Sequence, residues 1–184
     1  MKPVRPLAHP IWGPQPRIAE GRIILRPFRP GDAWAMRAWD RDPETQRFFD
    51  YPDLPPPDEH LRRIWWVIGR WAREYERGET IPFMVEDAGN GSALGSVELH
   101  DVRDDEAEIS FMTVPEHRGE GVASAAVSLL VARAFELFGI RRIFLEHDPA
   151  NAASAAIARH AGFAETERSS ERVRSVRQTR GAER

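Results

Sequence analysis

The sequence predicts an α/β (α+β) fold with a mixed sheet and helices on both of its faces. Its predicted elements run strand, two helices, three strands, helix, strand and helix, so the helices are spread between the strands. That order favours helix layers on either side of a single sheet. The chain has 184 residues, 41% hydrophobic and 30% charged, which is the size and balance of one globular domain.

The N-terminal segment differs in composition from the rest of the chain. Residues 1–20 hold five prolines and no apolar periodicity, so they are expected to form an extended arm rather than a helix or a strand. Residues 21–184 are expected to form a single domain that ends in a short charged tail.

The first part of this domain is predicted to hold one strand and two helices. Arg22–Phe28 mixes apolar residues with arginines and stops at a Pro-Gly pair, as a strand does before a turn. Asp32 is expected to cap a helix that ends near Asp40. A second helix is predicted from Asp58, with an apolar face expected to lie in the core: Leu61, Ile64, Trp65, Ile68, Trp71 and Tyr75.

Three further strands are predicted close together along the chain. Ile81–Glu86 and Leu94–Leu99 flank Ala88–Gly91, a turn sequence typical of a hairpin. An acidic loop, Asp101–Glu106, then leads to a strand over Ala107–Val114.

The last third of the chain is predicted to alternate helices and strands. A long apolar helix over Val122–Phe138 should end at Gly139, a residue type favoured just after a helix. A buried strand, Arg142–His147, and a short helix from Asn151 to Ala161 follow. The 21 residues after Phe163 justify one further strand, because few of them are apolar.

Composition excludes several classes of protein and of site. A formal net charge of −3 offers no basic field for a nucleic-acid backbone, so no nucleic-acid partner is expected. No apolar run approaches the roughly 18 residues of a membrane span, and none resembles a signal peptide. A cytoplasmic protein without a membrane partner is therefore expected. The absence of cysteine excludes disulfides, thiolate metal sites and an acetyl-cysteine intermediate, and no metal is expected.

The loop before the long apolar helix has the chemistry of an anion site. Gly119 and Gly121 let backbone N–H groups approach a ligand, and the N-terminus of the following helix favours negative charge. Arg118 adds a positive charge beside them. A pyrophosphate is the expected ligand, and an ordinary strand-to-helix turn is the alternative use of the glycines.

Two nucleotide-binding motifs fit this loop less well. A Walker loop is excluded because no Gly-Lys-Ser/Thr follows the first glycine at the required spacing. The glycines and Ser124 match part of a dinucleotide fingerprint, and Glu146 mimics its ribose-binding acid. Only 60 residues follow Ser124, however, whereas that fold has several strand-helix units after its motif.

Two motifs resemble those of the GNAT superfamily of acetyl-CoA-dependent N-acetyltransferases. The cofactor motif of that family, Gln/Arg-x-x-Gly-x-Gly/Ala, is matched by Arg118–Ala123. A later signature, Asn-x-x-Ser and then Gly-Phe, is matched by Asn151, Ser154, Gly162 and Phe163. In form the chain resembles the branch of ribosomal-protein-alanine N-acetyltransferases and their small-molecule relatives. The resemblance implies a mixed, mostly antiparallel central sheet of six to seven strands, with acetyl-CoA as acetyl donor.

The resemblance also implies which residues hold the donor. Those expected to bind acetyl-CoA are Met112, Val114, Arg118, Gly119, Glu120, Gly121, Val122, Ala123 and Asn151. A backbone N–H at or near Met112 is expected to stabilise the tetrahedral oxyanion. Asn151 is also a good helix N-cap, and the two roles are compatible.

Glu146 is the first candidate for the general base, because some protein-acetylating relatives carry a Glu five residues before the signature Asn. The alternative role for Glu146 is a rim carboxylate paired with an arginine such as Arg142. Glu108 is the second candidate base. His147 and His100 are further candidates as proton carriers.

The residue that would protonate the leaving thiolate differs from the one that many relatives use. Many relatives use a Tyr in the last helix, but this chain has only Tyr51 and Tyr75, and Ala158 stands at that position. Ser154 is the candidate acid instead. A catalytically weakened sensor or scaffold that binds acetyl-CoA is therefore the alternative to an active enzyme.

The acceptor is expected to be a primary amine, on a protein N-terminus or on a small molecule. Trp66 lies off the apolar helical stripe and is a candidate to line a groove. The acidic stretch Asp101–Glu108, with five acids against one Arg, is a candidate to attract a cationic amine. Because one C-terminal strand is predicted, a second copy of the chain is a candidate to complete the sheet edge in a homodimer, and a loose tail is the alternative.

Overall fold

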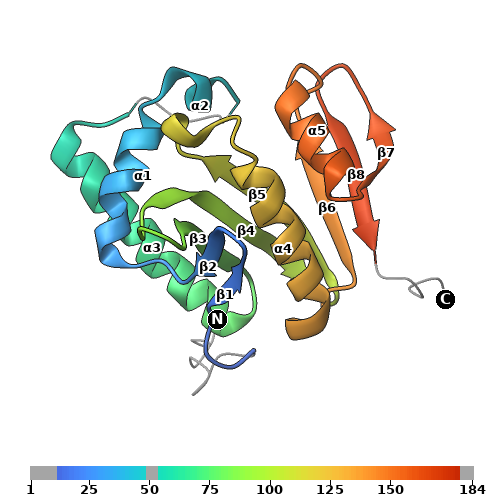
Figure 1. Ribbon diagram of the computed structural model, residues 1–184, viewed down its shortest axis with the longest axis horizontal. Coiled ribbons are helices and arrows are strands. Elements are labelled where there is room, and N and C mark those ends of the chain that lie inside the picture. Colours follow the sequence, from blue (N-terminus) through green and yellow to red (C-terminus); the bar gives the residue numbers. More distant parts are fainter. Residues whose placement is uncertain (1–11, 49–53, 179–184) are drawn as a thin grey trace, which may run out of the picture.

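The computed structural model describes residues 12–48 and 54–178, which form one sheet with helices on both faces (Figure 1). The strands are β1 (Ile18–Glu20), β2 (Ile23–Arg26), β3 (Ile81–Asp87), β4 (Ala93–Arg103), β5 (Glu106–Thr113), β6 (Arg142–His147), β7 (Ala164–Arg168) and β8 (Val173–Gln178). The α-helices are α1 (Ala33–Asp40), α2 (Pro43–Phe48), α3 (Pro57–Arg77), α4 (Val122–Leu137) and α5 (Ala152–His160).

The strands lie in the order β1-β2-β3-β4-β5-β6-β8-β7. Within the described ranges β5 and β6 pair in parallel, and every other neighbouring pair is antiparallel. The predicted α/β class with a mixed, mostly antiparallel sheet is therefore confirmed. The sheet has eight strands where six to seven were expected.

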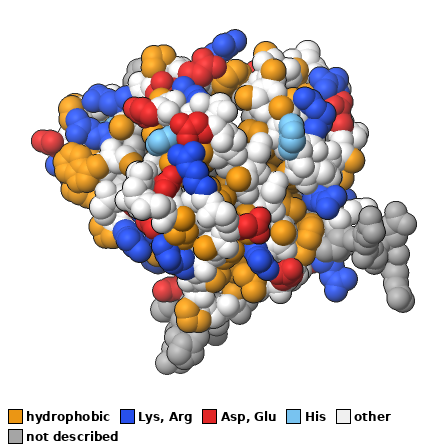
Figure 2. Space-filling view, in the orientation of Figure 1, with side chains coloured by type: hydrophobic (Ala, Val, Ile, Leu, Met, Phe, Trp, Pro, Cys, Tyr) orange, Lys and Arg blue, Asp and Glu red, His pale blue; other side chains and the backbone are white. Residues whose placement is uncertain are grey.

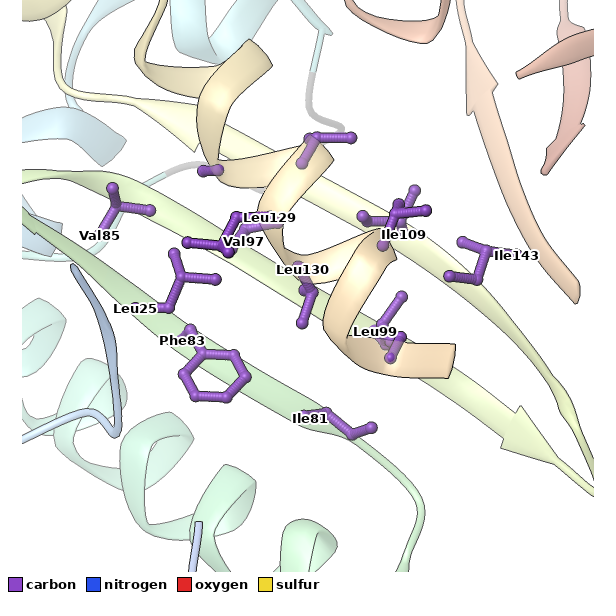
Figure 3. Close-up of a cluster of buried hydrophobic side chains, with 14 of the residues drawn as sticks. Leu25, Ile81, Phe83, Val85, Val97, Leu99, Ile109, Leu129, Leu130 and Ile143 are labelled. Atoms are coloured by element: carbon purple, nitrogen blue, oxygen red, sulfur yellow. The ribbon is translucent and has the colours of Figure 1, made fainter. Parts of the chain in front are cut away.

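One face of the sheet is covered by α4. Successive side chains of a strand point to opposite faces, so the buried residues of β4 and β5 alternate with half-buried ones. Figure 3 shows Leu129 and Leu130 of α4 directed at Val97, Leu99 and Ile109 on these strands. All five side chains are at most 2% exposed, so this face forms the main core.

The opposite face carries a second core under α1 and α3. Its buried members are Ala33, Met36, Trp39, Leu61, Ile64, Ile68 and Met84. The predicted apolar stripe of α3 is correct for its aliphatic residues and for Tyr75, which lies in the main core. It is wrong for Trp65, which is 44% exposed and donates its ring N–H to the Pro30 carbonyl at 3.0 Å. Trp65 sits one position past Ile64, at the edge of the stripe rather than at its centre.

The described part of the N-terminal arm packs on the chain's own core. Ile18–Glu20 pairs with β2 as strand β1, so the prediction of neither helix nor strand over residues 1–20 is wrong at this point. A three-residue strand is too short to show a period in the sequence. The Trp12 ring packs 5.5 Å from the rings of Tyr75 and Phe138. Residues 1–11 lie outside the described ranges.

The C-terminus forms two strands, not the one predicted. β8 buries Val173 and Ser175 and pairs with β6, whereas every residue of β7 is exposed. An exposed edge strand needs no apolar alternation, so its sequence gives no strand pattern. β7 occupies the edge that a partner chain was expected to complete. The end of the charged tail, residues 179–184, lies outside the described ranges.

Arg26 is the cation of a buried ion cluster where β2 ends. Its side chain is 5% exposed and donates two hydrogen bonds of 2.8 Å to the carboxylate of Asp32, and it also contacts Glu86. Asp32 holds the predicted N-cap position of α1, but its carboxylate accepts from Arg26 and from the Arg29 backbone instead of from the helix. The cluster therefore joins β2, β3 and the start of α1.

Arg26→Met is expected to lower the free energy of unfolding by about 3–5 kcal/mol at pH 7, because it leaves the buried Asp32 carboxylate without its cation and Glu86 with only the exposed Arg17. The hydrogen bond from Arg26 lowers the pKa of Glu86, so this stabilisation is present above the ordinary carboxyl pKa and is lost as the pH falls through the lowered value. Urea denaturation between pH 7 and pH 3 measures both effects. Arg17→Met is the control, since Arg17 pairs with Glu86 while 56% exposed. A loss below about 1 kcal/mol for Arg26→Met contradicts the assignment.

Candidate active site

The site begins where the two parallel strands separate. β5 and β6 pair over three residues, Glu106–Glu108 with Arg142–Phe144, and then diverge. Figure 1 shows β6, β8 and β7 as a wing beside the rest of the sheet. The second half of β5 is left without a strand neighbour on this side. A cavity of about 500 Å³ lies here, lined by Ile109–Thr113 of β5 and by Glu146–Asp148 at the end of β6.

The glycine-bearing loop and the start of α4 form one wall of this cavity. Gly119 and Gly121 both have φ of +78°, a left-handed conformation that other residues rarely adopt. Gly121 is the N-cap residue of α4, so it has no side chain to satisfy the first N–H groups of the helix, which lack partners within the helix. The loop therefore offers backbone donors and a positive helix end, which fit a pyrophosphate.

Charged side chains of the same loop fix the loop to its surroundings, and of these Arg118 lines the cavity whereas Glu120 does not. Glu120 accepts a hydrogen bond of 2.7 Å from Arg22, which lowers the pKa of the Glu120 carboxyl. Arg118 donates to Thr45 at 2.8 Å and pairs with Asp42, whose pKa it lowers. The loop is thus tied on one side to β2 and on the other to the N-terminus of α2.

The short helix α2 is a part of the site that the sequence did not reveal. Glu44, Thr45 and Phe48 line the cavity beside the glycine loop. Asp42 caps this helix by accepting from the Thr45 backbone N–H at 2.8 Å. A six-residue helix is shorter than two turns, so it has no apolar period to detect.

The start of α5 forms the far end of the cavity. Asn151 accepts a hydrogen bond of 3.0 Å from the Ser154 backbone N–H, so the predicted N-cap of this helix is confirmed. Asn151 and Ser154 both line the cavity. Of the residues predicted to hold the donor, all line it except Val114, which packs on the second core, and Glu120.

Glu146 lines the cavity but is held by two arginines. Its carboxylate lies 2.9 Å from Arg172 and 3.3 Å from Arg174, and the side chain is 17% exposed. These contacts are of the kind considered as its alternative role, with other partners than Arg142, which pairs with Glu106. The catalytic role of Glu146 stays a prediction.

The remaining proton-carrying candidates lie at different places. Glu108 is the strand partner of His100 on β5, and burial raises the pKa of its carboxyl. His147 lines the cavity, and its Nδ1 bonds to the carbonyl of Asp148 at 2.8 Å. Tyr75 lies in the main core, where burial raises its pKa to about 12.

A second cavity, of about 380 Å³, lies under α1 and α3. Ser110, Phe111 and Met112 of β5 line both cavities, so the two spaces meet at this strand. The wall of the second cavity is mostly apolar, and its residues include Met36, Trp39, Leu54, Pro55, Ile64, Val67 and Trp71.

Two acidic groups interrupt this apolar wall, and sequence analysis found neither. Glu98 of β4 lies opposite Ser110, and burial raises the pKa of its carboxyl. Its Oε2 is inaccessible to water and has no hydrogen-bond partner among the described residues. Asp40 lies 3.0 Å from Nε2 of His60, which is 4% exposed. An isolated polar residue within a strand or helix pattern gives no motif, and its partner is distant in the sequence.

The two predicted features of the acceptor side lie outside both cavities. Trp66 is 60% exposed on α3 and carries the Arg70 guanidinium 5.4 Å above its ring. The acidic segment Asp101–Glu106 is mostly strand, with its turn at Asp104 and Asp105. Figure 2 shows acidic and basic side chains interspersed over one face of the molecule.

Within residues 12–48 and 54–178, no three His, Asp or Glu side chains are grouped so that they could hold a metal ion. No helix in the same part of the chain has the length and apolar character needed to cross a bilayer.

Comparison with known proteins agrees with this architecture. Residues 22–164 match the family model of the acetyltransferase (GNAT) domain. The chain is 26% identical over 130 residues to the uncharacterized N-acetyltransferase YoaA of Bacillus subtilis (strain 168), covering 70% of this chain and 71% of that protein.

Solved structures share the fold at lower identity. The RimJ protein of Mycobacterium smegmatis, in complex with CoA-disulfide, superimposes with a TM-score of 0.82 at 19% identity, over 96% of this chain and 92% of that one. The spermidine N-acetyltransferase of Vibrio cholerae, in complex with CoA and spermine, has a TM-score of 0.72 at 18% identity, over 86% and 96%. With the family model matched over most of its length, this chain belongs to the GNAT acetyltransferase family and is an acyltransferase.

Proposed function

We propose that this protein transfers the acetyl group of acetyl-CoA to a primary amine, on a protein N-terminus or a small molecule, by direct attack. One observation carries the proposal: a cavity with a backbone anion seat and a cavity with a buried carboxylate meet at Ser110–Met112. Donor and acceptor can thus approach one strand from opposite sides. The CoA complexes of the RimJ and spermidine N-acetyltransferase structures support the choice of donor.

The glycine loop is the proposed seat of the donor's pyrophosphate. Backbone N–H groups at Gly119–Ala123 and the N-terminus of α4 would bind it, since the charged side chains of the loop are committed elsewhere. Acetyl-CoA supplies a thioester, whose carbonyl carbon accepts the amine. A backbone N–H of β5 at or near Met112, on the side of β5 that has no strand partner, is the proposed oxyanion donor.

The acceptor is proposed to enter the 380 Å³ cavity, the acceptor cavity, as an ammonium ion. Its apolar wall suits the body of the acceptor, and the carboxylate of Glu98 suits the charged end. The amine must lose a proton before attack. At pH 7 this costs about 1 kcal/mol for an α-amino group and roughly 4–5 kcal/mol for a Lys side chain.

We refer to the 500 Å³ cavity as the donor cavity, and its residues are proposed to act as the general base and the general acid. Glu146 would take the second proton from the amine nitrogen after attack, and Ser154 would protonate the leaving thiolate. Both line the cavity in which the thioester end of the donor is expected. A sensor that binds acetyl-CoA without turnover is the second candidate function, since the family's usual Tyr is absent from the described part of α5.

Acetyl-CoA is expected to bind the purified protein with measurable heat, and release of CoA thiol is expected with at least one amine. The acceptor panel should hold peptides with free N-termini, polyamines and aminoglycosides, with N-acetylated peptides as the control. Binding heat without thiol release on any amine would favour the sensor. No heat with acetyl-CoA or CoA would contradict both functions.

Gly121→Ala is expected to weaken acetyl-CoA binding by roughly 5- to 30-fold, the equivalent of the 1–2 kcal/mol strain of a left-handed residue. Relief of that strain would rotate the backbone donors away from the pyrophosphate. Gly139→Ala is the matched control, because Gly139 lies at the other end of α4 with φ of +71° and open space around it. Calorimetry with acetyl-CoA should show weaker binding for Gly121→Ala and wild-type affinity for Gly139→Ala. Equal affinities would exclude a backbone seat at Gly121.

Glu146→Gln is expected to lower the rate at pH 7 by about 100-fold or more, in the range of a lost general base, with acetyl-CoA affinity within about twofold of wild type. Glu106→Gln removes a similar exposed pair, with Arg142, and serves as the control. Steady-state rates and calorimetry give the two quantities. An unchanged rate would leave Glu146 with only the structural role that its arginine contacts suggest.

A further inference from the structure

We propose that Ser110, His100 and Asp101 form a proton relay that leads from the reaction centre to solvent and deprotonates the acceptor ammonium before attack. The proposal rests on the function proposed above, and it identifies the route by which a proton released in that reaction reaches solvent. Nε2 of His100 lies 2.8 Å from the Ser110 hydroxyl, and Nδ1 lies 2.9 Å from the Asp101 carboxylate. The three side chains thus form one continuous chain of hydrogen bonds.

The backbone of β4 is irregular in a way that this series of hydrogen bonds requires. Adjacent residues of a strand point to opposite faces, so a regular strand would keep Asp101 away from the ring of His100. Asp101 instead has φ of +50°, and the pairing with β5 shifts between His100 and Arg103. This break brings the carboxylate back to the face of the imidazole. A left-handed Asp is tolerated but uncommon.

The two ends of the proposed relay, Ser110 and Asp101, lie in different environments. Ser110 lines both the donor and the acceptor cavity, where the amine and the thioester are proposed to meet. The His100 side chain is 25% exposed and that of Asp101 is 66% exposed. Both line a third cavity, of about 580 Å³, together with residues of α3 and of the segment before β3. Protons can therefore pass from the place where the two cavities meet to an exposed carboxylate over two hydrogen bonds.

The chemistry of the relay follows from the donor and acceptor capacity of each group. A carboxylate on Nδ1 keeps the proton of neutral His100 on that nitrogen, so Nε2 is free to accept. The Ser110 hydroxyl then donates to Nε2 and can accept a proton from the ammonium on its own oxygen. Ser110 passes its original proton to Nε2, and the imidazolium, held by Asp101, releases a proton to solvent.

The proton balance of the reaction calls for such a route. An ammonium ion and acetyl-CoA give an N-acetylated amine, CoA thiol and one free proton. The nitrogen loses two protons, one of which ends on the thiol sulfur. The other has to reach solvent from a cavity that is largely apolar. The relay supplies this path, while Glu146 and Ser154 remain assigned to the proton that goes to sulfur.

The groups around His100 are mainly acidic. Those that face it or share its cavity are Glu98, Asp101 and Arg103 of β4, Glu108 of β5, Arg70 and Glu74 of α3, and Glu79. Carboxylates outnumber guanidinium groups here, so the imidazolium that forms during transfer has mainly anionic neighbours. Reciprocally, His100 acts against the burial that raises the pKa of Glu98 and Glu108.

Ser110→Ala and His100→Gln test the relay with two acceptors, an amine of ordinary high pKa and one of low pKa that is already a free base at pH 7. With the first acceptor, both variants are expected to lose at least about tenfold in kcat at pH 7. The loss should shrink to within about threefold with the low-pKa amine, which needs no deprotonation by the protein. It should also become smaller at pH 9.5, where about a tenth of an amine of pKa about 10.4 is already free base. Acetyl-CoA affinity and Tm should stay at wild-type values.

His160→Gln is the matched control, since His160 lies exposed at the end of α5 and bonds only to a backbone carbonyl among the described residues. Asp101→Asn is a second relay variant that keeps the contact but loses the charge, and it should show a smaller loss with the same pH dependence.

A loss that is equal at all pH values and for both amines would show a structural role and overturn the relay. Wild-type rates in both variants would overturn it as well. Absence of turnover by the wild type on every amine would instead overturn the proposed function on which the relay rests.

Discussion

The limited pairing of β5 with β6 is the constraint on which the rest of the site depends. Three residue pairs hold the two strands together, and beyond them β6 belongs to a wing with β8 and β7. If the pairing continued, the strand would fill the donor cavity and satisfy the backbone groups of β5 that face it. Separation leaves those groups available and brings the ends of β6 and α5 to one side of the cavity, opposite the glycine loop. Gly95 of β4 lies against the other side of β5 so closely that a Cβ there would come within 2.1 Å of the Met112 carbonyl.

Sequence analysis succeeded where the determining interactions are local. The turn at Gly119 and Gly121, the cap at Asn151 and the strand Arg142–His147 all follow from residues within a few positions of one another, and the structure has them where they were expected. The fold class followed from the order of such elements. It failed for β1 and α2, which are too short to show a period, and for β7, which buries nothing. The acidic groups of the acceptor cavity were missed for a different reason, because Glu98 and Asp40 enter one cavity only when α1, α3 and the sheet come together.

Arginine side chains connect the segments that surround the donor cavity. Arg118 links the glycine loop to α2, Arg22 links it to β2 through Glu120, and Arg172 links β8 to the end of β6. Each of these pairs is at least partly exposed and contributes little to stability by itself. Their effect is on position, because they hold three separate walls of one cavity in register. An arginine suits this task because its planar guanidinium can bond to two acceptors at once, as Arg118 does with Asp42 and Thr45.

Separate exits for two protons explain why the polar groups of the site are divided between the faces of β5. A single base that took both protons from the nitrogen would have to release the first to solvent before it could accept the second, while donor and acceptor were both bound. With Ser110 and His100 on one side and Glu146 and Ser154 on the other, the first proton can leave before attack and the second can move towards sulfur afterwards. The division also suits the energetics, since the cost of the first step depends on the pKa of the free amine and the second step starts from a far more acidic, positively charged nitrogen. The acceptor that the protein favours is thus linked to the strength of the relay: an α-amino group needs it least, and a side-chain amine of high pKa needs it most.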